Sequence, residues 1–184
     1  GSTEEQIEES KRAMSKMNAI LGHPDRIKKL AVDIVGHYES LCAEKPEIVQ
    51  KAMIVCADRK IAFHVLKAIE FLRPDWTVKR KAENEDELTQ EQLDKLEALP
   101  KINLVATQGQ NDDKELYDLC GTKEHRKMLD KQFKNTDSNF KIAIVVDMWI
   151  TGFDVPSLAV MYIDKPLQKH TLIQTISRVN RVFD

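Results

Sequence analysis

Three side chains near the C-terminal end of the chain are of types that bind phosphate well. Gln174, Arg178 and Arg181 are spaced four and three residues apart, so a helix would place all three on one face. Two guanidinium groups and an amide in one row form a donor-rich surface that suits phosphate oxygens. An amphipathic helix with two solvated arginines would show the same spacing, which leaves both interpretations open.

A second cluster follows a short apolar run at 141–146. Thr151, Gly152 and Asp154 bring together a hydroxyl, a carboxylate and a glycine that lets the backbone approach a ligand closely. Pro156 stops the segment from continuing in regular structure. A turn without any ligand would look similar, so these residues are candidates only.

Two charged residues follow another apolar run, at 51–57. Asp58 is well placed to cap the helical pattern that comes next, with Arg59 in the first turn. Capping by Asp58 beside a solvated Arg59 is the simplest interpretation. A ligand-binding role for the pair is the alternative, because ligands bind outside the carboxyl ends of the strands in open parallel sheets.

No metal site is expected. The three cysteines, Cys42, Cys56 and Cys120, form no C-x-x-C pair, and the five histidines show no ligand spacing near them. An odd number of widely separated cysteines also argues against a disulfide framework. We therefore expect buried or free thiols in a reducing cytosol.

The composition is that of an ordinary globular chain. Its 184 residues are 42% hydrophobic and 32% charged, which argues against disorder and against a membrane protein. The formal net charge is −2, so a nucleic-acid role must depend on local patches and motifs. The N-terminus does not look like a signal peptide. Gly1-Ser2 without an initiator Met is interpreted as a cloning scar on a chain cut from something larger.

Hydrophobic periodicity predicts helices that alternate with strands. Helices are expected over 3–21, 24–44, 61–71, 89–97, 112–120, 123–134 and 168–181. Strands are expected at 51–57, 76–82, 102–106, 141–146 and 159–163. This alternation predicts an α/β fold in which helices sandwich a parallel sheet. A change of texture predicts a helical lead-in segment at 1–48 and one domain at 49–184.

Taken together, the two C-terminal clusters resemble motifs V and VI of superfamily 2 helicases and translocases. The run at 141–158 contains TGFDVPSL, MYIDKP follows at 161–166, and HTLIQTISRVNRVF follows at 170–183. In this order and at these distances they are similar to the R subunit of type I restriction enzymes. Residues 51–59 resemble motif IV more weakly, with an Asp-Arg pair where that family usually has Ser-Arg.

The resemblance implies a second RecA-like motor domain, truncated at its C-terminal end, with ATP in the cleft between it and a first motor domain. Arg178 and Arg181 would be arginine fingers for the γ-phosphate, worth roughly 10³–10⁵ in rate. Gln174 would support them near the phosphates. Gly152 and Asp154 would lie at the nucleotide, with Asp154 a candidate acceptor for ribose hydroxyls.

The same resemblance implies that duplex DNA runs across both motor domains. Thr151 would contact a DNA phosphate or relay closure between the two sites, and Arg59 would be a contact to the DNA backbone. The partners implied are double-stranded DNA, the first RecA-like and nuclease domains of the same natural chain, and the modification and specificity subunits of a cytoplasmic prokaryotic complex. No membrane partner is implied. Recognition of a DNA sequence belongs to the specificity subunit in that family.

The departures from a complete motor are equally informative. The sequence contains no G-x-x-x-x-G-K-[ST] phosphate loop, and its only Asp-Glu pair, Asp86-Glu87, sits in the acidic stretch 83–97 rather than after a buried strand. No nuclease motif is convincing either. We therefore expect the chain alone to hydrolyse no ATP and cleave no DNA. In the parent enzyme, ATP and Mg²⁺ would be bound mainly by the first motor domain.

Two alternative functions remain open. One is the C-terminal half of another superfamily 2 DNA or RNA helicase without a nuclease. The other is a non-catalytic α/β interaction module that only docks partners. The MYIDKP segment together with the RVNR ending favours the restriction family.

Overall fold

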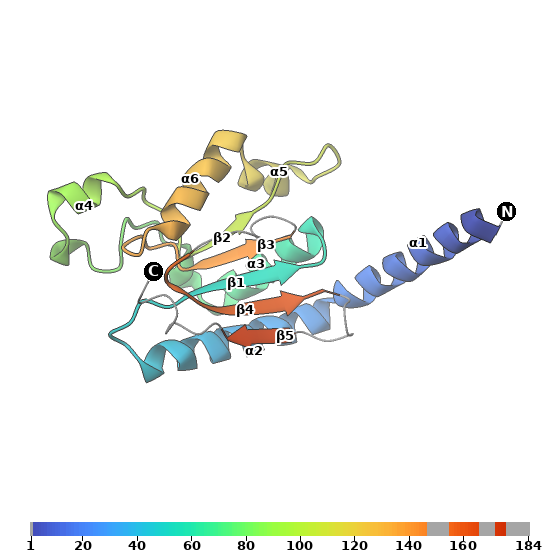
Figure 1. The fold of residues 1–184 in the computed structure, drawn as a ribbon, viewed down its shortest axis with the longest axis horizontal. Coiled ribbons are helices and arrows are strands. Elements are labelled where there is room, and N and C mark those ends of the chain that lie inside the picture. The colour runs from blue at the N-terminus through green and yellow to red at the C-terminus, as the bar shows by residue number, and fades with distance from the viewer. Residues whose placement is uncertain (1, 147–154, 166–171, 176–184) are drawn as a thin grey trace.

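A five-stranded sheet forms the centre of the computed structural model, which describes residues 2–146, 155–165 and 172–175. The strands are β1 (Lys51–Cys56), β2 (Ile102–Val105), β3 (Ile142–Val145), β4 (Leu158–Asp164) and β5 (Leu172–Thr175). Their order is β2-β3-β1-β4-β5 (Figure 1). The first four strands run parallel and β5 pairs antiparallel with β4. The predicted α/β fold with a parallel sheet is confirmed.

Every residue of β1 is buried, because this strand has neighbours on both sides and helices on both faces. Its alternate side chains enter two separate cores, as the period of two in a strand requires. Ala52 and Ile54 lie in a core with the helices of one face, whereas Met53 and Val55 lie in a core with a helix of the other face. An unbroken apolar run in the sequence is therefore the expected signal of such a central parallel strand.

The described part of the chain contains six α-helices and two 3-10 helices. They are α1 (Ser2–Leu21), α2 (Pro24–Glu44), α3 (Arg59–Leu72), η1 (Pro74–Thr77), α4 (Gln90–Asp94), α5 (Lys114–Cys120) and α6 (Lys123–Lys134), and a short 3-10 turn, η2, spans Glu85–Glu87. Helices α2, α3 and α5 contribute to the first core, and α6 contributes Leu129 and Phe133 to the second.

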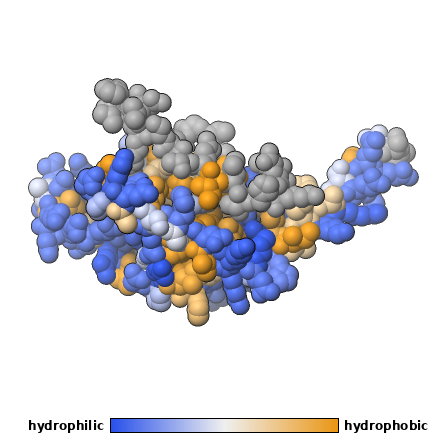
Figure 2. Space-filling model, turned by 90° about the horizontal axis from the view of Figure 1, so that it is seen from below, coloured by the Kyte–Doolittle hydropathy of each residue, from blue (hydrophilic) through white to orange (hydrophobic). Residues whose placement is uncertain are grey.

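The two N-terminal helices differ in how they contact the sheet. α2 packs along α3 with an apolar stripe that runs from Ile27 to Tyr38. α1 projects away from the body and joins it only near its C-terminal end, where Leu21 is buried (Figure 1). Figure 2 shows the same division, with apolar surface at the base of this projection and a largely hydrophilic outer part.

Two predicted elements are wrong. The helix expected over 168–181 contains the strand β5 at Leu172–Thr175, which pairs with β4 from Val160 to Ile163. The edge strand expected over 76–82 is instead the end of the 3-10 helix η1 followed by a single antiparallel bridge between Arg80 and Leu99. Pro74 and Asp75 favour a turn there over a strand.

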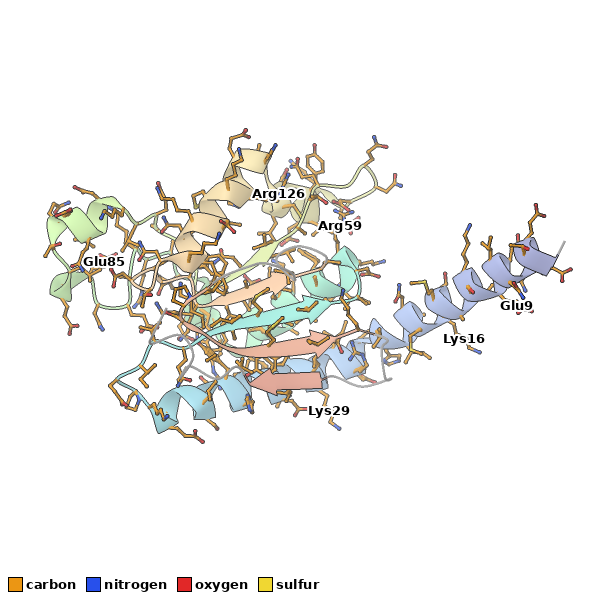
Figure 3. All side chains as sticks on the ribbon, in the orientation of Figure 1. Glu9, Lys16, Lys29, Arg59, Glu85 and Arg126 are labelled. Carbon is orange, nitrogen blue, oxygen red and sulfur yellow. The ribbon has the colours of Figure 1, made fainter. Side chains whose placement is uncertain are left out.

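The acidic stretch 83–97 lies at the amino end of the parallel strands. Its seven carboxylates are all exposed to solvent, and its helical second half is the short α4, which begins with a capping box formed by Thr89 and Gln92. Figure 3 shows Glu85 beyond the amino ends of the strands, whereas Arg59 lies beside their carboxyl ends. The described helices include none that is long and apolar enough to span a bilayer.

Candidate nucleic-acid interface at the carboxyl edge of the sheet

The carboxyl ends of β1, β2, β3 and β4 meet at one edge of the sheet because these strands are parallel. Ligands of open parallel sheets bind outside this edge. The residues that follow β1 begin α3, and the residues that follow β2 form a loop at 106–113. This juxtaposition brings two segments together that are about fifty positions apart in the sequence.

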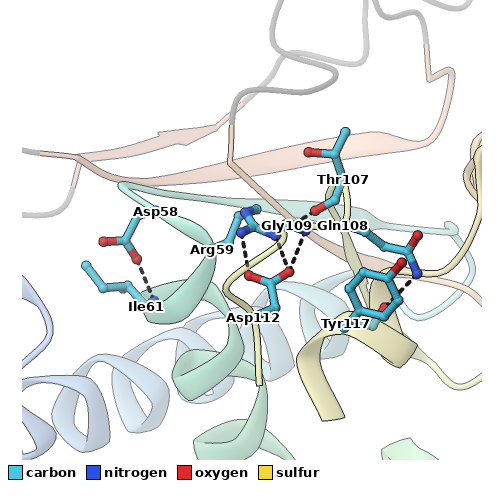
Figure 4. Close-up of polar contacts among 8 residues, drawn as sticks. All are labelled: Asp58, Arg59, Ile61, Thr107, Gln108, Gly109, Asp112 and Tyr117. Carbon is cyan, nitrogen blue, oxygen red and sulfur yellow. Dashed lines mark hydrogen bonds and ion pairs between the residues drawn. The ribbon is translucent and has the colours of Figure 1, made fainter. Parts of the chain in front are cut away.

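Asp58 is a helix cap, as its position after β1 predicts. Its Oδ1 accepts a hydrogen bond of 2.7 Å from the backbone N–H of Ile61, and this bond satisfies one of the donors at the start of α3 (Figure 4). The carboxylate is thereby used in the fold. This confirms the capping half of the sequence interpretation.

Arg59 is not a freely solvated side chain, in contrast to the simplest expectation for it. Its Nη1 donates to Oδ2 of Asp112 over 2.5 Å and to the carbonyl oxygen of Thr107 over 2.7 Å, and its Nη2 pairs with Oδ1 of Asp112 (Figure 4). This is the two-pronged geometry in which guanidinium and carboxylate bind most strongly. The contact joins the start of α3 to the loop after β2.

The two charges of this pair influence each other's protonation. The Arg59 guanidinium holds the pKa of the Asp112 carboxyl below its usual value, and the backbone N–H of Gly109 contributes in the same direction. Asp112 in turn raises the pKa of Arg59. Both groups therefore stay charged at neutral pH.

Gly109 lies against the guanidinium, and its missing side chain makes that contact possible. A Cβ atom built on this residue would come within 2.0 Å of Nη2 of Arg59. Neither Gly109 nor Asp112 was a candidate from the sequence, since both belong to a polar loop with no recognisable motif. The available signal was their position after a predicted buried strand.

A second ion pair lies at the same edge, at the end of β4. Nη1 and Nη2 of Arg26 donate to the two carboxylate oxygens of Asp164 over 2.8 and 2.6 Å, and Nε donates to the carbonyl oxygen of Leu21 over 2.6 Å. The Asp164 side chain is only 1% exposed. Asp164 belongs to the MYIDKP segment, and the structure gives it a partner in the first turn of α2 that the sequence did not indicate.

The remaining predicted site residues fall outside the described part of the chain. These are Thr151, Gly152, Asp154, Arg178 and Arg181, and their roles stay predictions. The described part includes the backbone of Gln174, which lies in β5 opposite Met161. Because Gln174 lies in a strand, the expected helix over 168–181 does not include it. The predicted alignment of Gln174 with the two arginines on one helix face therefore has no basis.

The described residues contain no group of three or more His, Cys, Asp or Glu side chains that could hold a metal ion. Cys42, Cys56 and Cys120 are free thiols, with Cys56 and Cys120 buried. Burial raises the pKa of all three thiols, so they are protonated at neutral pH and poor ligands or nucleophiles. Their role is in packing.

An α/β sheet of this topology, with charged loops at its carboxyl edge and helices over both faces, is consistent with a RecA-like domain. Residues 15–184 match the family model of type I restriction enzyme subunit R domain 3. The chain belongs to this family.

Individual relatives agree with the family match. The type I restriction enzyme HindI endonuclease subunit of Haemophilus influenzae is 33% identical over 177 residues, which cover 96% of this chain and 15% of that protein. A Methanocaldococcus jannaschii protein provisionally assigned as the type I restriction enzyme MjaIXP endonuclease subunit is 34% identical over 177 residues, or 96% of this chain and 14% of that protein. The SauCOLORF180P endonuclease subunit of Staphylococcus aureus is 46% identical over 63 residues, 33% of this chain and 7% of that protein. The chain thus spans about 15% of the length of the first of these relatives.

Proposed function

We propose that this chain is the second motor domain of the ATP-dependent, DNA-translocating subunit of a type I restriction enzyme. The observation that supports this most directly is the family match over residues 15–184, together with a parallel sheet at whose carboxyl edge Arg59 begins α3 and pairs with Asp112. The names of the relatives describe endonuclease subunits. Translocation, arginine fingers and DNA contacts are our inference for this chain.

In the proposed mechanism, Arg178 and Arg181 reach across a cleft to the γ-phosphate of an ATP bound with Mg²⁺ mainly on the first motor domain. ATP supplies the phosphoryl group and the energy of its hydrolysis. The two guanidinium groups stabilise the negative charge of the transition state, a contribution of roughly 10³–10⁵ in rate in enzymes that use an arginine finger. Gln174, Gly152 and Asp154 bind and orient the nucleotide from this side.

Arg59 and Thr151 are proposed to bind the phosphate backbone of duplex DNA. A basic side chain at the carboxyl edge, next to the nucleotide cleft, would let closure of the two motor domains move the DNA. The first and nuclease domains of the same natural chain, and the modification and specificity subunits, are the proposed partners.

The test replaces Arg178 or Arg181 by Ala in the full-length subunit within its assembled enzyme. DNA-stimulated ATP hydrolysis should fall by roughly a thousandfold or more, since an arginine finger is worth that much, while binding to the recognition sequence persists. The 184-residue chain alone should show no DNA-stimulated ATPase, because its sequence contains no phosphate loop. Wild-type turnover in both variants would remove their assigned role, and an active isolated chain would contradict the motor-half assignment.

A further inference from the structure

The guanidinium of Arg59 is held by a loop whose own geometry is fixed. The Asp112 side chain that binds it is only 5% exposed, and Oδ2 of Asp112 also accepts a 2.7 Å hydrogen bond from the backbone N–H of Gly109. The backbone N–H of Asp112 donates to the carbonyl oxygen of Gly109 over 3.2 Å, which closes the turn. The carboxylate therefore has one position, and the guanidinium takes its orientation from it.

We propose that Asp112 and Gly109 are positioning residues that fix the Arg59 guanidinium for contact with a DNA phosphate. This inference rests on the proposed function, in which Arg59 binds the DNA backbone. Asp112 holds the guanidinium through an ion pair with Nη1 and Nη2, and Gly109, which has no side chain, leaves the space that the guanidinium occupies.

The hydrogen bonds of Arg59 leave a defined part of the guanidinium available. Asp112 and the carbonyl of Thr107 occupy the end that carries Nη1 and Nη2. No described hydrogen bond involves the Nε–H, and the side chain remains 29% exposed. The Nε–H is therefore the donor that we assign to a phosphate oxygen, with Asp112 keeping its contacts at the end that carries Nη1 and Nη2.

Prior orientation strengthens such a contact because the side chain is ordered before the ligand arrives. A long arginine side chain in solvent would have to give up several rotamers on binding, whereas a guanidinium fixed by three acceptor contacts has already done so. Alternatively, the Asp112 carboxylate would mask the charge of Arg59 and compete with the phosphate. Removal of the carboxylate lowers DNA affinity if Asp112 orients Arg59, and raises DNA affinity if Asp112 masks its charge.

Gly109 offers a variant that moves the guanidinium without changing any charge. In Gly109→Ala, the added methyl group would overlap Nη2 of Arg59, since the Cβ position lies 2.0 Å from that atom. The side chain must then leave its site beside Asp112. Gly109→Ala and Asp112→Asn should therefore have the same effect on DNA binding, although only Asp112→Asn alters the charge.

The experiment measures ATP hydrolysis by the full-length subunit in its assembled enzyme as a function of duplex DNA concentration. Arg59→Gln should raise the half-saturating DNA concentration roughly tenfold and lower the log–log salt slope by about one, as loss of one phosphate contact predicts. Asp112→Asn and Gly109→Ala should each raise this concentration about three- to tenfold, with the rate at saturating DNA within about twofold of wild type. Adding Asp112→Asn to Arg59→Gln should have no further effect.

The possible outcomes separate this inference from the proposed function. If Arg59→Gln leaves the half-saturating concentration unchanged, the DNA contact itself is wrong. If Arg59→Gln weakens binding but Asp112→Asn and Gly109→Ala do not, the positioning role is wrong and the DNA contact stands. Tighter DNA binding by Asp112→Asn would mean that Asp112 masks the charge, which also overturns the inference. Gly109→Ala still decides the question if Asp112→Asn fails to fold.

Discussion

Lys51 begins the central strand with a fully buried side chain at the amino end of the sheet, away from the candidate site. Its Nζ donates to the carbonyl oxygens of Phe133 and Asn135 over 2.6 and 2.8 Å, which belong to the last turn of α6 and the residue after it. Lys141 makes comparable contacts to the carbonyls of Thr136 and Ser138 from the residue before β3. Lys51 thus binds carbonyls at the C-terminal end of α6, and Lys141 binds carbonyls of the loop that follows this helix. Their role is structural.

Burial lowers the pKa of Lys51 to about 6, and the neighbouring Lys141 contributes in the same direction. Asp137 opposes this shift. A lysine in the unfolded chain has a pKa near 10.4. Between these two values the unfolded chain binds one more proton than the folded chain, so the free energy of unfolding rises with pH.

We therefore predict that Lys51→Met flattens the pH dependence of stability. In the wild-type chain, this group adds about 2 kcal/mol to the free energy of unfolding between pH 6.5 and 8.5, at up to ~1.4 kcal/mol per pH unit. Urea unfolding at several pH values measures the slope. Lys16→Met, at an exposed position of α1, is the matched control and should keep the wild-type slope. Equal slopes in wild type and Lys51→Met would contradict the assignment.

At the scale of elements, α2 is joined to β4 by polar contacts as well as by its apolar stripe. Arg26 binds Asp164 at the carboxyl end of the strand. Nδ1 of His37 lies 2.7 Å from the hydroxyl of Tyr162, which precedes Asp164 in the same strand. These contacts fix α2, which belongs to the predicted lead-in segment, to the strand that contains the start of MYIDKP. Helix α2 thus packs as one unit with the sheet.

Breaking the Arg26–Asp164 pair from one side should be costly. Arg26→Met leaves a carboxylate that is 1% exposed without its guanidinium, and the loss of one partner from a buried pair typically costs about 3–5 kcal/mol. Urea unfolding of the chain at pH 7 measures this cost. Adding Asp164→Asn should recover part of it, because the uncharged amide is cheaper to bury.

The exposed pair Arg12–Glu8 in α1 provides the control. Its side chains are 78% and 69% exposed, and a surface pair of this type contributes less than about 1 kcal/mol. If Arg12→Met and Arg26→Met destabilise the chain equally, burial of Asp164 is not the reason for the effect.

The sequence predicted most elements of the fold because their signals are local. From Ala52 onward β1 reads as an unbroken apolar run, as does all of β3, and α2 begins at Pro24 and ends shortly before Pro46, as expected. β5 was missed because its four residues carry apolar positions that also fit a helix, and only pairing with β4 decides between the two. Local periodicity cannot supply that pairing.

The candidate site divides in the same way. Capping by Asp58 could be predicted, since the cap and the helix it begins are neighbours in the sequence. The partners of Arg59 could not, because Asp112 is 53 positions away and meets it only when β1 and β2 end at the same edge. Asp164 lay within a recognised segment, but its contact to Arg26 spans 138 positions.

At the scale of the whole molecule, the net charge of −2 hides a separation of charge along the strands. The acidic stretch lies at the amino end of the sheet and Arg59 at the carboxyl end (Figure 3). The six residues of β1 between the two ends span about 20 Å. At 0.15 M salt the Debye length is about 8 Å, so exposed carboxylates at one end act only weakly on a phosphate at the other.

This separation predicts which charges matter for DNA. In the full-length subunit, the triple change Glu85→Gln, Asp86→Asn and Glu87→Gln should alter DNA affinity by less than about twofold at 0.15 M salt, because these carboxylates are beyond the screening distance. Arg59→Gln changes one charge instead of three and should weaken binding more. The comparison is made by titrating duplex DNA at 0.05 and 0.15 M salt, where lower salt should enlarge the effect of the triple change. A large gain in affinity from the triple change at 0.15 M would place the acidic stretch beside the DNA and contradict a path along the carboxyl edge.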